Sequence, residues 1–261
     1  MSNTKDLASQ LDKATATFAS FKAFEEEFPI GEAYAIQDEF LELRRTRTGS
    51  PKVGYKVALT SPGAQNALKS TQPAYGQLLK LDVEVSGAII SISKHFAPIL
   101  ETELIFKITA DLSHSASLDE IMSKSVVAAG IECPESRFLK WFGGAFPALA
   151  LRHVIADNCL AGFIVTSDHW VDASTLDFPN LTCELFVNSK LAISGSGLEV
   201  LGNPVKAIEW LNQTLVKKGL ELKTGDIISS GTFTGPILGS VGDAVARFSD
   251  GIGEVKLTFL P

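Results

Sequence analysis

The chain has 261 residues, in which 30 Asp and Glu residues outnumber 23 Lys and Arg residues and give a net charge of −7. It has no basic stripe and no apolar run long enough to span a bilayer, so we expect neither nucleic acid nor a membrane as a partner. Its three cysteines are odd in number and widely spaced, and its first residues lack the apolar core of a signal peptide. These features indicate a cytoplasmic protein without a disulfide framework or a zinc site.

The first fifty residues are predicted to be helical. Apolar residues that recur at three- and four-residue spacing predict helices over residues 3–24 and 32–47. The second pattern ends in arginines before Gly49, which is typical of a helix end. No Gly/Ser-rich or Pro-rich linker follows. We therefore expect an N-terminal helical region, residues 1–50, that packs on one compact β-rich catalytic domain, residues 51–261.

The rest of the chain alternates many short β-like runs with few helices. The predicted strands cover residues 53–59, 83–92, 101–109, 126–133, 161–167, 181–187, 190–194, 226–230, 243–248 and 254–260. The predicted helices cover residues 62–68, 118–124, 147–155 and 204–218, and Asn203 is the expected cap of the last one. Asn188-Ser189 is typical of a hairpin turn. Few crossover helices favour an α+β fold with a largely β core over a doubly wound fold.

Three glutamates form the most informative pattern in the sequence. Glu101 and Glu103 begin a β-branched and aromatic run, and on a strand their side chains share one face because side chains alternate with period two. Glu132 lies beside another apolar run. Three carboxylates at one site repel each other unless a cation neutralises them, and an all-oxygen set suits Mg²⁺ or Mn²⁺ better than zinc. The alternative is that each glutamate is a solvated surface residue.

These residues also carry a family resemblance. Glu101-x-Glu103, the Glu-x-x-Glu-Ser-Arg string at 132–137 and Gly54-Tyr-Lys-Val-Ala-Leu-Thr-Ser61 together resemble the 2-keto-4-pentenoate hydratase family of the fumarylacetoacetate hydrolase superfamily, which includes the 4-oxalocrotonate decarboxylases. The likeness continues through Ala156-Asp-Asn158, Val200-Leu-Gly-Asn-Pro204 and Gly225-Asp-Ile227. It implies a mixed β-roll or sandwich core with flanking helices.

The resemblance implies a lyase that hydrates a 2-hydroxy-2,4-dienoate to a 4-hydroxy-2-oxo acid in the meta-cleavage degradation of aromatic compounds, with a divalent ion that stabilises the enolate charge. Three alternatives stay open: a 4-oxalocrotonate-type decarboxylase, an acylpyruvate C–C hydrolase and a non-catalytic partner subunit. The hydrolase would want a histidine beside a carboxylate, and the sequence has no clear pair. The resemblance further implies a homo-oligomer, with a sister decarboxylase or hydratase as a potential partner.

Lys56 and Asp157 are the predicted catalytic residues. Lys56 lies in the apolar run 53–59, and the resemblance implies that it transfers protons. Burial and a cation would lower its pKa, whereas nearby carboxylates would raise it, so the net direction stays open. The alternative for Lys56 is a solvated amine on an edge strand. Asp157 is predicted to orient a water molecule or Lys56, and the alternative is a helix cap.

Hydroxyl, amide and guanidinium groups near these motifs are the predicted substrate contacts. They are Thr60, Ser61, Ser136, Arg137, Asn158, Thr232 and Thr234. Ser61-Pro62 is also an ordinary helix start, and Arg137 is also suited to an ion pair or to holding a ligand carboxylate. The sequence departs from the family at Cys133-Pro134 and Glu135, where Ile-Val and Asp are common, and at Cys159-Leu160, where Ala-Ser is usual.

The arginines bear on the choice between hydratase and decarboxylase. A 4-oxalocrotonate decarboxylase must accept a second carboxylate and should offer it a cation. Arg137 and Arg152 are the only arginines in the central part of the chain. Arg137 lies close to the Glu132 ligand, and Arg152 lies on a predicted helix. The sequence therefore favours a monocarboxylate substrate and hydration.

Overall fold

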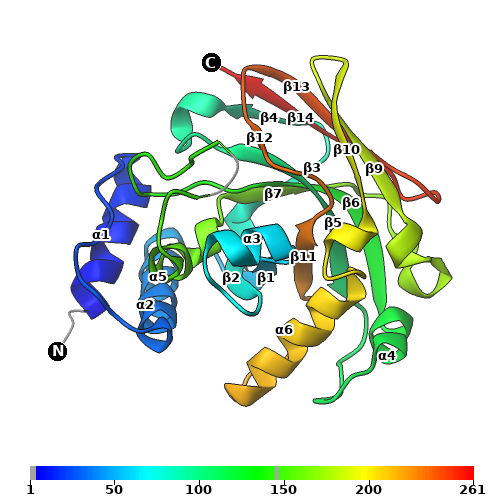
Figure 1. The fold of residues 1–261 in the computed structure, drawn as a ribbon, viewed down its shortest axis with the longest axis horizontal. Coiled ribbons are helices and arrows are strands. Elements are labelled where there is room, and N and C mark those ends of the chain that lie inside the picture. Colours follow the sequence, from blue (N-terminus) through cyan, green and yellow to red (C-terminus); the bar gives the residue numbers. More distant parts are fainter. Residues whose placement is uncertain (1–3, 145–146) are drawn as a thin grey trace.

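Two β-sheets form the centre of the computed structural model, which describes residues 4–144 and 147–261 (Figure 1). The larger sheet has the strand order β2-β1-β11-β5-β6-β7-β3, with β12 beside β5 and β8 beside β6, and the smaller sheet has the order β10-β9-β13-β14-β4. The strands are β1 (Lys52–Ala58), β2 (Ala74–Leu79), β3 (Val83–Val85), β4 (Ala88–Ser91), β5 (Ile99–Ile108), β6 (Ser125–Cys133), β7 (Phe163–Thr166), β8 (Val171–Asp172), β9 (Thr182–Val187), β10 (Lys190–Ser196), β11 (Ile227–Thr232), β12 (Ile237–Leu238), β13 (Gly242–Phe248) and β14 (Gly253–Leu260).

The α-helices lie outside these sheets (Figure 1). They are α1 (Thr4–Thr17), α2 (Ile30–Thr48), α3 (Pro62–Ala67), α4 (Leu118–Ser123), α5 (Leu151–Ala156) and α6 (Val205–Lys217). Helices α1, α2 and α5 gather at one end of the molecule, on the left in Figure 1, while α6 and α4 lie along its lower side. None of the described helices has the length and apolarity needed to cross a membrane. Mixed sheets with flanking helices confirm the predicted α+β fold.

Strand β5 separates the sandwich core from the candidate site. Leu104 and Phe106 point toward the smaller sheet and join a core cluster that includes Leu185 and Leu257. Burying each such side chain stabilises the fold by about 1.5–3 kcal/mol. Because side chains alternate along a strand, the odd-numbered residues of β5 point to the opposite face. Glu101 and Glu103 therefore lie on the face of the large sheet that is turned away from the sandwich core.

The N-terminal region departs from its predicted form. The helix expected over residues 3–24 ends at Thr17, and Phe18 has a positive φ of 52°. Beyond it the backbone N–H of Phe21 donates to the carbonyl of Arg137 at 3.0 Å. Phe21, Phe24 and the helices α1 and α2 pack into one apolar cluster that also contains residues from the segment 138–160. The division of the chain at residue 50 stays a prediction.

One turn divides a predicted strand, while a predicted hairpin and a predicted helix cap are present. The single strand predicted over residues 83–92 is two strands, because Gly87 has a φ of 92° and turns the chain from the large sheet into the small one. The hairpin predicted at Asn188-Ser189 is confirmed, with φ values of 49° and 64°. The predicted cap of α6 is also present, since Oδ1 of Asn203 accepts from the backbone N–H of Val205 at 2.9 Å.

Candidate active site

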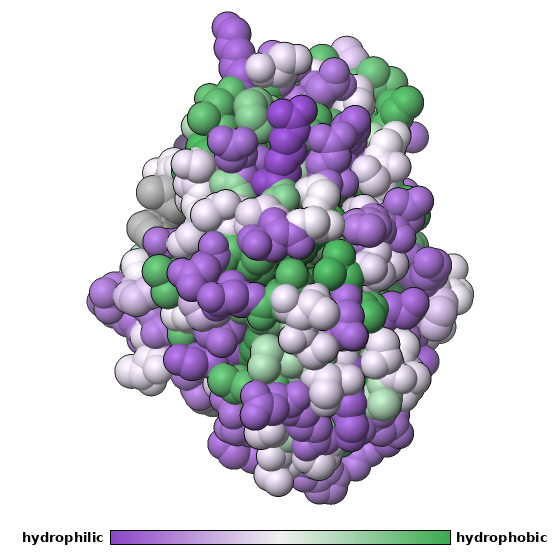
Figure 2. All heavy atoms as spheres, turned by 90° about the vertical axis from the view of Figure 1, so that its right-hand side faces the viewer, coloured by the Kyte–Doolittle hydropathy of each residue, from purple (hydrophilic) through white to green (hydrophobic). Residues whose placement is uncertain are grey.

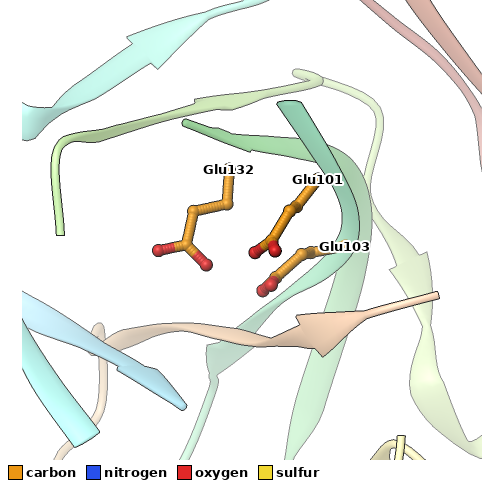
Figure 3. A group of neighbouring side chains, drawn as sticks. All are labelled: Glu101, Glu103 and Glu132. Carbon is orange, nitrogen blue, oxygen red and sulfur yellow. The ribbon is translucent and has the colours of Figure 1, made fainter. Parts of the chain in front are cut away.

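The three predicted ligands meet on neighbouring strands (Figure 3). Glu101 and Glu132 stand opposite each other in the antiparallel β5–β6 ladder, and Glu103 follows two residues along β5. Thr102 lies between them and points the other way, with its hydroxyl 3.1 Å from Sγ of Cys183 in the small sheet. One carboxylate oxygen from each glutamate lies within 4.8 Å of the others. The strand period and the ladder register together bring the set to one point.

Burial makes this cluster electrostatically unfavourable without a cation. The side chains of Glu103 and Glu132 are buried and that of Glu101 is half-buried. Burial, followed by the charge of Glu132, raises the pKa of Glu101 to about 7, although Lys56 acts in the opposite direction. Burial and the charges of Glu132 and Glu101 raise the pKa of Glu103 well above its ordinary value. A bound cation would stabilise all three groups as carboxylates.

The free oxygens of the cluster fit a hard divalent ion. Oε2 of Glu103 accepts from the Ser229 hydroxyl at 2.6 Å and from the Gly231 N–H at 2.8 Å. Among the described residues neither oxygen of Glu132 has a hydrogen-bond partner, since its ion pair with Lys56 lacks hydrogen-bond geometry. Unpartnered buried carboxylate oxygens are costly. Mg²⁺ and Mn²⁺ prefer oxygen ligands of this kind, so the donor set fits such an ion.

Lys56 points into the same cluster from β1. Its Nζ lies 2.9 Å from Oε1 of Glu132 and donates to the carbonyl of Cys159 at 3.0 Å. The side chain is buried, so the edge-strand alternative is wrong. Burial alone would lower the pKa of Lys56, but the charges of Glu132 and its neighbours outweigh it and raise the pKa above its ordinary value. Without a metal, Lys56 is therefore an ammonium group.

A left-handed turn aims the Cys159 carbonyl at Lys56. Asn158, Cys159 and Leu160 have φ values of 55°, 50° and 61°, which is costly for residues with a Cβ, at roughly 1 kcal/mol or more each. The side chain of Asn158 offsets this cost by bonding the backbone N–H and C=O of Gln77, both at 2.8 Å. The Cys159 thiol donates to the carbonyl of Tyr75 at 3.1 Å. The predicted contact residue Asn158 thus holds the turn, and substrate contact by it stays a prediction.

Asp157, Arg137 and Ser136 form a buried network behind the cavity. Nε of Arg137 lies 2.5 Å from Oδ1 of Asp157, and its Nη1 donates to the carbonyl of Ala161 at 2.9 Å. The Ser136 hydroxyl donates to Oδ2 of Asp157 at 2.5 Å. None of these three residues is among those that line the cavity. The ion-pair alternative for Arg137 is present, while a catalytic role for Asp157 and substrate contact by Arg137 and Ser136 stay predictions.

A cavity of about 450 Å³ lies above the glutamates and Lys56. The predicted contacts Thr60, Ser61, Thr232 and Thr234 all line it. Oγ of Ser61 also accepts from the N–H of Ala64, so this residue both caps α3 and faces the cavity. The structure therefore brings together the three ligands, Lys56 and four of the seven predicted substrate contacts.

Several lining residues carried no signal in the sequence. Trp141, Phe142 and Leu160 give the cavity an apolar wall, and Ser194 and Glu199 add polar groups from β10 and the turn after it. They are far apart in the chain, and only the tertiary fold unites them. Sequence reasoning also missed a histidine–carboxylate pair. Nδ1 of His95 lies 3.0 Å from Oε2 of Glu135, but neither residue lines the cavity.

Known proteins resemble this chain along nearly its whole length. Residues 146–259 match the family described as the fumarylacetoacetate (FAA) hydrolase C-terminal domain. A 2-keto-4-pentenoate hydratase from Burkholderia vietnamiensis is 28% identical over 97% of this chain and 96% of its own length. A 2-hydroxypent-2,4-dienoate hydratase from Pseudomonas putida is 30% identical over 80% of this chain and 92% of its own.

Solved structures share the fold. The 4-oxalocrotonate decarboxylase from Pseudomonas putida, complexed with magnesium and adipate, superposes with a TM-score of 0.90 at 23% identity, covering 98% of this chain and 97% of that one. The fumarylpyruvate hydrolase from Pseudomonas aeruginosa, in complex with Mn²⁺ and pyruvate, has a TM-score of 0.61 at 14% identity, covering 79% and 88%. Taken with the motifs and the sequence relatives, this chain belongs to the 2-keto-4-pentenoate hydratase family of the fumarylacetoacetate hydrolase superfamily.

Proposed function

We propose that this protein is a divalent-metal-dependent hydro-lyase that adds water to a 2-hydroxy-2,4-dienoate and forms a 4-hydroxy-2-oxo acid. The observation that carries the proposal is the convergence of Glu101, Glu103, Glu132 and Lys56 in one cavity with a hydroxyl-bearing wall. The sequence relatives named as hydratases of such dienoates support the same reaction.

The three glutamates would hold Mg²⁺ or Mn²⁺. Such an ion, when bound, would receive the carboxylate and 2-oxo oxygens of the acid and stabilise negative charge on them. Hydrogen bonds to Glu103 orient its carboxylate for binding the ion. Because Ser229 and Gly231 bind its Oε2, the other oxygen of that carboxylate is directed to the shared point.

Lys56 is the proposed proton carrier. The 2-hydroxy-dienoate first ketonises: the 2-hydroxyl loses a proton, and C5 gains one. Water then adds to C4 of the resulting 2-oxo-3-enoate, and C3 takes up the remaining proton, so the net change is one added water. Lys56 carries the proton that the substrate carbons need, and the Cys159 carbonyl fixes the direction of one of its N–H groups. A cation held by the glutamates would lower the pKa of Lys56 from its raised, metal-free value and so make the ammonium a better acid.

The hydroxyls of Thr60, Ser61, Thr232 and Thr234 are the proposed holders of the attacking water. They line the same cavity as Lys56, and a hydratase needs polar groups near C4, the carbon to which water adds. The hydrolase alternative finds less support. Among the described residues no histidine lines the cavity, and the His95–Glu135 pair lies outside it.

The proposal includes a cytoplasmic homo-oligomer that associates with a sister decarboxylase or hydratase. Figure 2 supports an assembly surface, because apolar side chains gather in the middle of the face that lies on the right in Figure 1. Exposed apolar residues on the small sheet include Leu191 on β10 and Leu260 on β14. Sedimentation of the purified protein tests the oligomer, and a monomer at micromolar concentration would refute it.

One experiment separates hydration from decarboxylation. The protein is incubated with Mg²⁺ and either 2-hydroxypenta-2,4-dienoate or 4-oxalocrotonate, while the 4-hydroxy-2-oxo acid is followed by NMR and CO₂ by a coupled assay. We expect the hydroxy acid from the first substrate and no CO₂ from the second. Release of CO₂ from 4-oxalocrotonate without hydration of the pentadienoate would establish the decarboxylase alternative instead.

A further inference from the structure

The cavity has one apolar side and one polar side. One part comes from the apolar cluster that also holds the N-terminal helices, and Leu68, Trp141, Val154 and Leu160 belong to it, with Phe142 packed against it. The other part comes from β10, the turn after it and the loop after β11. It carries hydroxyls and one carboxylate, that of Glu199. A substrate anchored by its 2-oxo acid end at the glutamates would have its remaining atoms between these surfaces.

The cavity is larger than the smallest member of the substrate class needs. A volume of about 450 Å³ falls in the range of roughly 300–1,000 Å³ that is typical of pockets for drug-sized ligands. A pentadienoate ends in a bare CH₂ group and would leave the partly exposed ring of Phe142, which lies beside the buried Trp141, in contact with water. An apolar substituent on the distal carbon would cover that surface and gain free energy from its burial.

The charges around the cavity disfavour a second carboxylate. Among the described lining residues Lys56 is the cation, and it is already bound to Glu132 and the Cys159 carbonyl. Arg152 pairs with Glu27 at 2.6 Å and, like Arg137, does not line the cavity. A distal carboxylate would therefore find no free cation among these residues.

Glu199 adds a negative charge to the lining of the cavity. It is exposed, and its carboxylate forms no hydrogen bond or ion pair with any residue in the described part of the chain. Together with Ser194 and Gly195 it lines both the cavity and a second groove, which also contains Glu184 and Arg247. Arg247 is paired with Glu254 at 3.1 Å, so it does not neutralise this carboxylate.

We propose that the site selects 2-hydroxy-2,4-dienoate monocarboxylates with an apolar substituent on the distal carbon, and that Glu199 is the residue that rejects dicarboxylates. The inference rests on the proposed function, because it assumes that the 2-oxo acid end is held at the glutamates. Trp141 and Phe142 provide the favourable contact for the apolar group. Glu199 provides the repulsive one, and selectivity commonly needs both.

Unreactive 2-oxo acids test this selectivity without turnover. Calorimetry with Mg²⁺ present gives the Kd of pyruvate, 2-oxohexanoate and 2-oxoadipate for the wild type. The last two differ in their distal end, methyl against carboxylate. We expect 2-oxohexanoate to bind at least about ten-fold more tightly than pyruvate, because each fully buried methylene contributes about four-fold. We expect 2-oxoadipate to bind at least about ten-fold more weakly than 2-oxohexanoate.

Two variants assign the selectivity to residues. Glu199→Gln should tighten the Kd of 2-oxoadipate about five-fold and leave 2-oxohexanoate unchanged, since one partly screened like charge is removed. Glu84→Gln, an exposed glutamate of β3 outside the cavity, is the matched control and should change neither Kd. Phe142→Ala should reduce the advantage of 2-oxohexanoate over pyruvate, whereas Phe18→Ala, at an exposed phenylalanine elsewhere, should preserve it.

The outcomes distinguish this inference from the function on which it rests. Equal binding of 2-oxohexanoate and 2-oxoadipate by the wild type would overturn the inference alone, as would an unchanged ratio in Glu199→Gln. Absence of Mg²⁺-dependent binding of any 2-oxo acid would overturn the proposed site and the inference with it. Turnover provides a second measurement: kcat/KM should be higher for 2-hydroxyhexa-2,4-dienoate than for the pentadienoate and lowest for 2-hydroxyhepta-2,4-diene-1,7-dioate.

Discussion

Glu103→Gln tests the metal site most directly because it removes one ligand charge and almost no volume. A glutamine oxygen can still accept from Ser229 or Gly231, so the fold should survive. The variant loses one of three mutually repelling buried carboxylates, and its metal-free Tm should therefore match or exceed that of the wild type. Its affinity for Mg²⁺ should fall at least about ten-fold, since affinity follows the number of ligand charges.

The size of the effect follows from linkage. Mg²⁺ at a hundred times its Kd stabilises the wild type by about 2.7 kcal/mol. Chains of this size gain about 2–4 °C in Tm per kcal/mol, so the expected shift is about 5–11 °C. At the same Mg²⁺ concentration a ten-fold weaker Kd leaves about 1.4 kcal/mol, which corresponds to about 3–6 °C.

Differential scanning calorimetry at matched Mg²⁺ concentrations measures both shifts. Glu84→Gln is the control for loss of a glutamate charge elsewhere, and it should retain the full wild-type shift. The reasoning is refuted if Glu103→Gln keeps the whole Mg²⁺-induced shift, because Glu103 would then not be a ligand. A fall in the metal-free Tm of many degrees would refute the premise that the three carboxylates repel each other.

Three further predictions concern catalysis, stability and pH. Lys56→Met should leave Mg²⁺ binding intact by calorimetry and lower turnover at least ~100-fold, and near-normal turnover would remove Lys56 from the mechanism. Asp157→Asn should destabilise the protein by about 3–5 kcal/mol in urea, because Arg137 would lose its buried partner; a loss below about 1 kcal/mol would contradict this. Hydrogen bonds from the Ser113 hydroxyl and N–H lower the pKa of Glu120 to about 2. Its contribution to stability is therefore full above about pH 4.3 and is lost as the pH falls through about 2, and an NMR titration midpoint near 4 would count against it.

The local sequence pattern predicted those elements in which the conformational preferences of the residues and their tertiary contacts favour the same structure. Strand β6 is a nearly continuous apolar run, β5 carries β-branched and aromatic residues around Glu101 and Glu103, and α6 has both its stripe and its Asn203 cap. Tertiary pairing decided the rest. Residues 83–92 divide at Gly87, whose positive φ turns the chain, and the pairing of the two halves with different sheets is a tertiary feature. Residues 19–24 continue a helical pattern, yet they are extended because Phe21 bonds the backbone near Arg137.

The residues of the candidate site could be predicted where carboxylates recur at the spacing of a strand. Glu101 and Glu103 follow the strand period, and the resemblance indicated Glu132 and Lys56. Asn158 is a residue type that tolerates a positive φ, but Cys159 and Leu160 carried no sequence signal for the left-handed turn. Glu199 carried no signal either, since an isolated glutamate is ordinarily a solvated surface residue and only the cavity gives it a context.

The central position of β11 has a consequence for how the chain folds. This strand pairs Ser229 with Lys56 on one side and Thr232 with Glu103 on the other, so it joins residues from the first half of the chain through a segment near its end. A nascent chain that lacks β11 cannot hold the lysine beside the glutamates. Such long-range pairing gives a high contact order and slow folding. Uptake of Mg²⁺ during refolding should consequently coincide with the last phase, and the ion would act as a reporter of completed chain assembly.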